Sequence, residues 1–190
     1  MKVKGLTSYI FVFLLFFSCT TMKYKDMASS DPNRLISLRD SLDAELSPVL
    51  IEAFLEAYNK VGVQAYESEN YEKSIRLLLN SQELSPGDTL SKYYLLMASG
   101  GKKYESGKKE FLWESIQDFY KASALYPKRG EPFYFIGQSY LKLGDKDFDL
   151  IIESYEKALS LEIDEDLKAT ISNAKVEAIR RKNLLKSFWK

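Results

Sequence analysis

Apolar residues along most of the chain recur every three or four positions, the period of an α-helix with one buried face. Asp31 and Pro32 stand as a cap residue and a first-turn proline. The leucines that follow them keep this helical spacing: Leu35, Leu38, Leu42 and Leu46. Ser47 and Pro48 restart a helix in the same way. No segment sustains the period-two alternation of a strand, so the pattern predicts an all-helical protein.

Two of the expected helices carry the same side chains at the same offsets. In YNKVGVQAYESEN, the series is Tyr58, Val61, Gly62 and Ala65. In FYFIGQSYLKLGD, it is Phe133, Ile136, Gly137 and Tyr140. A glycine inside a helix lets a second helix approach closely. The chain therefore contains an internal repeat whose unit is a pair of packed helices.

The second helix of each pair repeats as well. Its matched positions are Ser74, Leu78, Ser81 and Pro86 in the first pair, Ser115, Phe119, Ala122 and Pro127 in the next, and Ile151, Tyr155, Ala158 and Ile163 in the last, where the proline is missing. A proline at this position stops the second helix and turns the chain into the next unit. Small residues such as Ala122 and Ala158 are expected at close helix contacts.

This repeat resembles the tetratricopeptide repeat, a helix-turn-helix unit of about 34 residues. The resemblance implies an all-α solenoid of three repeats, at about 55–88, 91–129 and 130–165, within a domain spanning 31–190. The middle repeat matches in part, and its first helix is expected to carry Tyr94, Met97, Ala98 and Gly101. The segment GKKYESGKKE, residues 101–110, is longer than the usual turn. It predicts an insertion loop, with a contact surface for anionic groups as the alternative.

Terminal units of a repeat array need covering helices. A helix over 31–46 is expected at one end and a helix over 164–188 at the other. The apolar stripe of the second comprises Leu167, Ile171, Ala174, Ala178, Leu185 and Phe188. Its last turns, IRRKNLLKSFWK, are basic and aromatic, which suits a capping helix with cations at its carboxyl end. Contact with a membrane or with a partner is the alternative.

The beginning of the sequence has the build of a secretory signal peptide. Lys2 and Lys4 precede a hydrophobic stretch, 6–17, which is shorter than the roughly 20 residues of a membrane-spanning helix. Ser18 before Cys19 resembles the bacterial lipobox, although phenylalanines occupy the two positions before Ser18. The resemblance implies cleavage of residues 1–18, acylation of Cys19 and a polar tether over 19–30. An uncleaved anchor and a buried structural cysteine are the alternatives.

The composition limits the chemistry that is expected. The 190 residues include 27 basic and 27 acidic side chains, one cysteine and no histidine. A neutral balance gives no argument for binding nucleic acid, and without histidine there is no conventional triad or usual zinc site. The acidic run GDKDFDLIIESYE has the spacing of a calcium loop, but Leu150 stands where that loop needs glycine. We therefore expect no enzyme, cofactor or metal site.

Tetratricopeptide arrays generally hold a protein or peptide in a groove lined by the first helix of each repeat. By this resemblance the groove comprises Asn59, Val63, Tyr66, Tyr134, Gln138 and Leu141. Tyr66 and Tyr134 are expected to be at least partly exposed, and Tyr58 and Phe133 to be packed. The carboxylate clamp of some family members is not matched, because Val63 and Phe135 occupy its positions.

Two functions follow as expectations. The first is a lipid-anchored scaffold of the bacterial cell envelope, which binds a protein or peptide partner and takes part in the assembly of an outer-membrane complex. The second is an accessory lipoprotein that partners a periplasmic solute-binding protein in small-molecule uptake. Thr20 and Thr21 follow Cys19 in place of the aspartate that retains enteric lipoproteins in the inner membrane. This favours the periplasmic face of the outer membrane.

Overall fold

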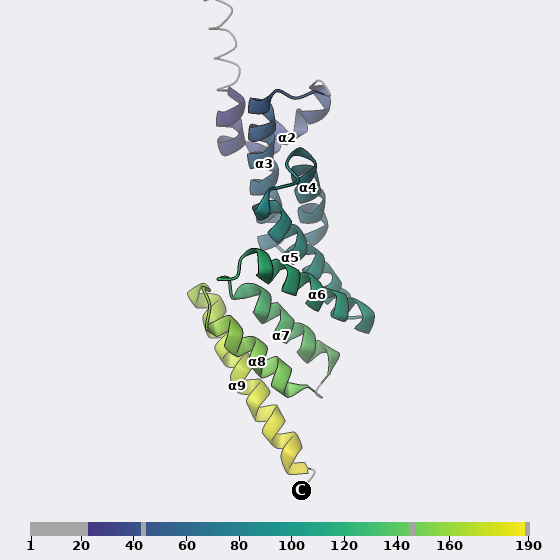
Figure 1. The fold of residues 1–190 in the computed structure, drawn as a ribbon, viewed down its shortest axis with the longest axis vertical. Coiled ribbons are helices and arrows are strands. Elements are labelled where there is room, and N and C mark those ends of the chain that lie inside the picture. Colours follow the sequence, from purple (N-terminus) through teal and green to yellow (C-terminus); the bar gives the residue numbers. More distant parts are fainter. Residues whose placement is uncertain (1–22, 43–44, 145–146, 189–190) are drawn as a thin grey trace, which may run out of the picture.

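The computed structural model describes residues 23–42, 45–144 and 147–188, in which it contains helices and no strand. Each α-helix from α2 onward packs against the next, as Figure 1 shows for the elongated array that ends in α9. The predicted all-α solenoid with flanking helices is confirmed. The helices are α2 (Pro32–Ser37), the 3-10 helix η1 (Arg39–Ser41), α3 (Pro48–Glu67), α4 (Tyr71–Leu84), α5 (Thr89–Ser106), α6 (Lys109–Leu125), α7 (Glu131–Leu143), α8 (Phe148–Leu159) and α9 (Glu165–Phe188).

The helices α3, α5 and α7 are the first members of three successive pairs, and α4, α6 and α8 are the second members. Because α5 contacts both α3 and α7, the first helices form one continuous layer, which we call the inner layer. Side-chain caps fix where several helices begin. The carboxylate of Asp88, for example, accepts the backbone N–H of Ser91 at 2.8 Å at the start of α5.

Glycines of the inner layer lie where a second helix crosses closely. A Cβ atom built on Gly62 of α3 would lie 2.8 Å from the Leu78 side chain of α4. One built on Gly137 of α7 would lie 2.5 Å from the ring of Tyr155 in α8. Both distances are shorter than van der Waals contact, so any larger residue would force the neighbouring side chain to move. These two contacts are the ones that the sequence repeat predicts.

In the middle pair the corresponding glycine is Gly100, whose added Cβ atom would lie 2.6 Å from the ring of Phe119 in α6. The sequence comparison places Ala98 at this position, and that alignment is wrong by two residues. The helix carries two adjacent glycines with different neighbours, which explains the error. Gly101 faces another neighbour, the ring of Tyr71 in α4.

The segment expected to be an insertion loop is helical. Its residues extend α5 to Ser106 and begin α6 at Lys109, so the turn consists of Gly107 and Lys108 alone. Gly107 has a φ of +66°, the left-handed conformation that commonly ends a helix. The extra residues therefore lengthen both helices of the middle pair.

The expected polar tether also differs in the structure. Residues 23–30 form a helix that packs against α3, and Ala28 is completely buried. The ammonium group of Lys25 lies 2.7 Å from the carboxylate of Glu52, and the hydroxyl of Ser29 donates to Glu56 at 2.9 Å. The tether prediction is wrong for residues 23–30. The predicted signal peptide and Cys19 lie outside the described residues.

The flanking helices differ in length from one end to the other. The helix expected over 31–46 is interrupted, because α2 and η1 end before Leu42 takes an extended conformation. α9 runs over nearly the residues expected for it and packs on α8 through Ile171 and Ala178, which are both buried. The array is therefore covered at both ends, and α9 is the longest helix among the elements from α2 onward.

Candidate functional site

Tyrosines from the first two helix pairs converge near the amino-terminal ends of α5 and α7. The rings of Tyr93 and Tyr94 meet edge to face, with centroids 5.0 Å apart. Tyr93 meets Tyr126 in the same way at 5.0 Å, and Tyr94 meets Tyr66 at 5.4 Å. The quadrupoles of the rings favour this arrangement. We call these four tyrosines, together with Arg129 and Glu131, the inner cluster.

The carboxylate of Glu131 is the acceptor at the centre of the inner cluster. It accepts the hydroxyl of Tyr66 at 2.6 Å and, more weakly, that of Tyr93 at 3.4 Å. Burial raises the pKa of Glu131, and the hydrogen bond from Tyr66 and the charge of Arg129 oppose that rise only in part. Burial and the neighbouring carboxylate together raise the pKa of Tyr66 well above its usual value.

The guanidinium of Arg129 is held by tyrosine rings. It lies 4.9, 5.6 and 5.0 Å from the ring centroids of Tyr93, Tyr94 and Tyr126, and it donates to the hydroxyl of Tyr94 at 3.0 Å. These distances are within the range of a cation–π interaction. No described carboxylate lies within ion-pair distance of Arg129, which is half-buried. The cation is therefore held by tyrosine rings and is only partly exposed.

Backbone hydrogen bonds to the turn between α8 and α9 hold the turn that carries Arg129. The backbone N–H of Gly130 donates to the carbonyl of Glu162 at 2.9 Å, and the N–H of Glu162 donates to the carbonyl of Lys128 at 2.8 Å. A turn between α6 and α7 is thereby joined to the turn between α8 and α9. The inner cluster thus ties α3, α5 and α7 together.

A second group of aromatic residues lies further along the inner layer. The ammonium of Lys142 sits 4.3 Å from the ring centroid of Tyr104 and donates to the Tyr104 carbonyl at 2.9 Å. The rings of Tyr134 and Tyr155 are 6.2 Å apart. The hydroxyl of Tyr155 is buried without a hydrogen-bond partner, and burial raises its pKa. Tyr104 and Tyr134 are half-buried, so this part of the layer is more open.

The structure places two of the predicted groove residues inside the array. Asn59 is buried, donates from its amide to Asp88 at 3.0 Å and accepts the hydroxyl of Ser81 at 2.6 Å. Tyr66 is only 7% exposed, so the expectation that it is partly exposed is wrong. Both side chains point toward α5 and α4 because the inner helices pack more closely than the repeat pattern alone indicates.

The remaining predicted groove residues are half-buried and accessible. They are Val63 on α3 and Tyr134, Gln138 and Leu141 on α7. The three on α7 are spaced by four and three residues, so they share one side of the helix. The structure thus brings together the α7 part of the predicted groove, beside Tyr104 of α5. We call Tyr104, Tyr134, Gln138 and Leu141 the inner face.

Sequence reasoning named Tyr66 as a groove residue and Tyr94 as a repeat position, but it did not predict that they belong to one cluster. Tyr93 and Tyr94 form a doublet in a helix whose register was uncertain, and Arg129 and Glu131 follow Pro127 in a turn. An arginine and a glutamate near a proline turn ordinarily indicate a solvated surface. Only the paired tyrosines gave a signal, because two adjacent aromatic residues cannot both lie on one narrow stripe.

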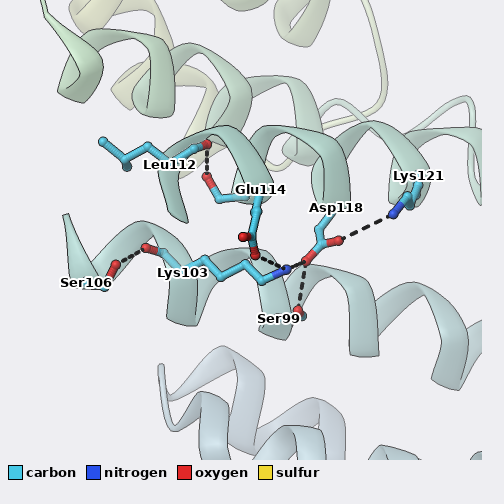
Figure 2. A network of polar contacts seen from close by, with 8 residues as sticks. Ser99, Lys103, Ser106, Leu112, Glu114, Asp118 and Lys121 are labelled. Atoms are coloured by element: carbon cyan, nitrogen blue, oxygen red, sulfur yellow. Dashed lines mark hydrogen bonds and ion pairs between the residues drawn. The ribbon is translucent and has the colours of Figure 1, made fainter. Parts of the chain in front are cut away.

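A polar network lies between α5 and α6, and Figure 2 shows it. The ammonium of Lys103 lies 2.7 Å from the Asp118 carboxylate and 3.3 Å from that of Glu114. The hydroxyl of Ser99 also donates to Asp118 at 2.8 Å. Burial would lower the pKa of Lys103, but its two carboxylate partners outweigh burial and raise it. Lys103 therefore stays charged, and the network joins two helices.

The described residues contain no group of three or more acidic or cysteine side chains that could hold a metal ion. Within the acidic run, Asp147 precedes α8 and Phe148 begins the helix, so the chain there is helical where a calcium loop would curve. No helix of the described ranges is long and apolar enough to cross a membrane.

No model of a known protein family matches the chain, and no curated protein sequence is significantly similar to it.

Proposed function

We propose that this protein is a lipid-anchored scaffold of the bacterial cell envelope, built from tetratricopeptide-like repeats, which holds a protein or peptide partner on its inner face. Acylated Cys19 attaches the array to the outer membrane on its periplasmic side. The helical residues 23–30 follow Cys19 closely in the sequence. The partner belongs to an outer-membrane complex that is being assembled.

The observation that carries this proposal is the open part of the inner layer. Half-buried aromatic and amide side chains of α5 and α7 stand beside each other there, on helices that are fixed by the inner cluster. A rigid surface with accessible tyrosines is typical of protein interfaces, because an aromatic anchor buries much area and loses little side-chain entropy. Gln138 supplies a donor and an acceptor for the backbone of a bound segment.

Site-specific photo-crosslinking in bacterial cells tests the binding surface. A photoreactive phenylalanine at Gln138 is expected to capture one partner, whereas the same group at Gln117, which is exposed on α6, is expected to capture none. Tyr134→Ala should weaken that capture by about 1 kcal/mol or more. Capture from Gln117 alone would contradict the assignment of the inner face.

The identity of the captured protein tests the rest of the proposal. A β-barrel protein or one of its assembly partners supports a role in outer-membrane complexes. A solute-binding protein would replace that role with accessory function in small-molecule uptake.

The lipid anchor has its own test. Metabolic labelling with a fatty-acid probe should mark the wild-type protein and leave Cys19→Ser unmarked. Equal labelling of the two proteins would exclude acylation of Cys19 while leaving the crosslinking result intact.

A further inference from the structure

The end of α9 carries apolar side chains that no other helix covers. The side chain of Lys182 pairs with Asp149, at the beginning of α8, so α9 has no further turn of α8 beside it beyond this point. Figure 1 shows this last part of α9 running past the neighbouring helices. The apolar residues there are 45%, 37% and 82% exposed: Leu184, Leu185 and Phe188. We call these three residues the α9 tip.

Basic residues flank the tip. Between Glu177 and the end of the sequence, the charged residues are arginine and lysine only. Lys186 lies between the two leucines and Phe188 along the helix. An apolar helix side with cations on its borders binds best to an apolar groove whose rim is acidic.

A groove of this kind lies between α6 and α8. Its volume is about 570 Å³. Tyr120 of α6 and Leu150 of α8 form its walls and are 47% and 41% exposed, and the ring of Phe133 in α7 lies edge to face with Tyr120 at 6.3 Å. Large apolar side chains exposed together mark an interaction surface more often than single ones do.

The α8 side of the groove carries two carboxylates and one ammonium group. Glu153 and Glu156 both line it. Glu156 pairs with Lys175 of α9 at 2.8 Å, whereas Glu153 has no ion-pair partner among the described residues. Lys157 lies over the Phe133 ring, with its nitrogen 5.8 Å from the centroid. Glu153 is therefore available to a cation on an incoming helix.

The tip cannot fill the groove of its own molecule. Asp149 and Glu156 of α8 pair with Lys182 and Lys175 of α9, and Glu156 stands at the edge between α9 and the groove. The rest of the α8 lining, which includes Leu150, Glu153 and Lys157, lies toward α6 and α7. α9 is continuous to Phe188, and it packs on α8 and not on α6. An occupant of the same composition must come from another molecule.

We infer that the α9 tip of one copy docks into the α6–α8 groove of a second copy. Leu184, Leu185 and Phe188 enter between Tyr120 and Leu150, and Lys186 of the first copy faces Glu153 of the second. The protein thus self-associates through two different surfaces of the same chain, a heterologous contact. Neither surface shares a residue with the inner face. One molecule can therefore self-associate and bind its partner at the same time.

Sedimentation of the full chain in mild detergent over a range of concentrations tests the inference. The wild type is expected to associate with rising concentration. The tip variant Leu184→Asp/Phe188→Asp and the groove variant Tyr120→Asp/Leu150→Asp are each expected to remain monomeric. In each variant the dissociation constant for self-association should rise at least tenfold. All the substituted residues are exposed, so circular dichroism should show unchanged melting.

A mixture of the two variants makes the test specific. The tip variant keeps an intact groove and the groove variant keeps an intact tip, so the mixture should form a heterodimer although neither protein associates alone. The matched control is Leu79→Asp, at a leucine that is 47% exposed on α4 and outside both surfaces, and it should associate as the wild type does. A wild type that stays monomeric at every concentration, or a mixture that does not associate, would overturn the inference.

Discussion

Single contacts between residues far apart in the chain hold the helices of the inner layer together. Tyr66 and Glu131 are 65 positions apart, and the hydrogen bond between them joins the first repeat to the third. The tyrosine hydroxyl loses water on folding, so its bond to the carboxylate replaces a lost interaction with solvent. The carboxylate in turn depends on hydroxyl donors and on the charge of Arg129.

Glu131→Ala should therefore leave the hydroxyl of Tyr66 buried without an acceptor. We expect the free energy of unfolding to fall by about 1–3 kcal/mol, which urea titration would measure. Glu110→Ala is the control, because Glu110 is exposed in the first turn of α6 and its loss should change stability by about 0.5 kcal/mol or less. Equal effects of both substitutions would contradict the role of Glu131.

The raised pKa of Glu131 gives a pH dependence of definite sign. An acid whose pKa is higher in the folded state binds its proton more tightly there, so it favours folding in acid and loses that contribution as pH rises through the raised value. Glu131→Gln removes this titration. The stability of the wild type relative to Glu131→Gln should be greatest below pH 4.5, the ordinary value for glutamate, and should decline above it. Urea titrations of both proteins at several pH values would measure it.

The contacts of two glycines were the part of the residue packing that the sequence predicted most accurately. Gly62 and Gly137 were recognised because neighbouring positions repeated around them, and both contact the predicted helices. Tyr66 was misplaced for a physical reason. The offsets of a repeat tell which side of a helix a residue occupies, but not how closely the next helix approaches that side. Exposure therefore depended on a distance that the pattern does not contain.

Gly137→Leu should place a large side chain against the ring of Tyr155, which a Cβ atom alone would approach to 2.5 Å. We expect a loss of about 1–3 kcal/mol of stability from overpacking. Gly87→Leu is the matched control, because a Cβ atom built on Gly87 meets no atom within 4 Å. A thermal melt of each protein would separate them, and an unchanged melting temperature for Gly137→Leu would refute the contact.

Whole helices were predicted well where their caps and periodicity agreed. The start of α3 follows Ser47 and Pro48 as expected, and the Ser47 hydroxyl accepts the backbone N–H of Leu50. The helix over 23–30 was missed although its signal is present. Tyr24 and Met27 pack against the cluster around Ala28, at three- and four-residue spacing, but a surrounding polar composition concealed them.

The ion pair between Lys103 and Asp118 joins the two long helices α5 and α6 (Figure 2). Asp118 is 7% exposed and accepts from both Lys103 and Ser99. Asp118→Ala should lower stability by about 1.5–3 kcal/mol, since hydrogen bonds to a charged group are lost. Glu114→Ala should cost about 1 kcal/mol or less, because that carboxylate is half exposed to solvent. Urea titration would measure both losses. A larger loss for Glu114→Ala than for Asp118→Ala would contradict the central role of Asp118 in the network.

At the scale of the whole molecule, the two described ends of the array lie far apart (Figure 1). The helix over 23–30 runs beside the beginning of α3, where Lys25 pairs with Glu52. The α9 tip projects from the opposite end. An anchor at Cys19 would therefore hold the α2–α3 end at the bilayer and point the tip away from it. Basic residues near the tip would then meet protein and not the lipid of the same membrane.

Fluorescence quenching on vesicles tests this orientation. A probe is attached at Asp26 or at Ser187, both exposed, in the acylated protein bound to vesicles that carry a quencher in their head groups. The probe at Asp26 should be quenched and the probe at Ser187 should not, because quenching in the head groups reaches only a short distance. A water-soluble quencher, as control, should reach both probes. Quenching of the probe at Ser187 by the lipid-bound quencher would mean that the α9 tip contacts the membrane, which would contradict this orientation.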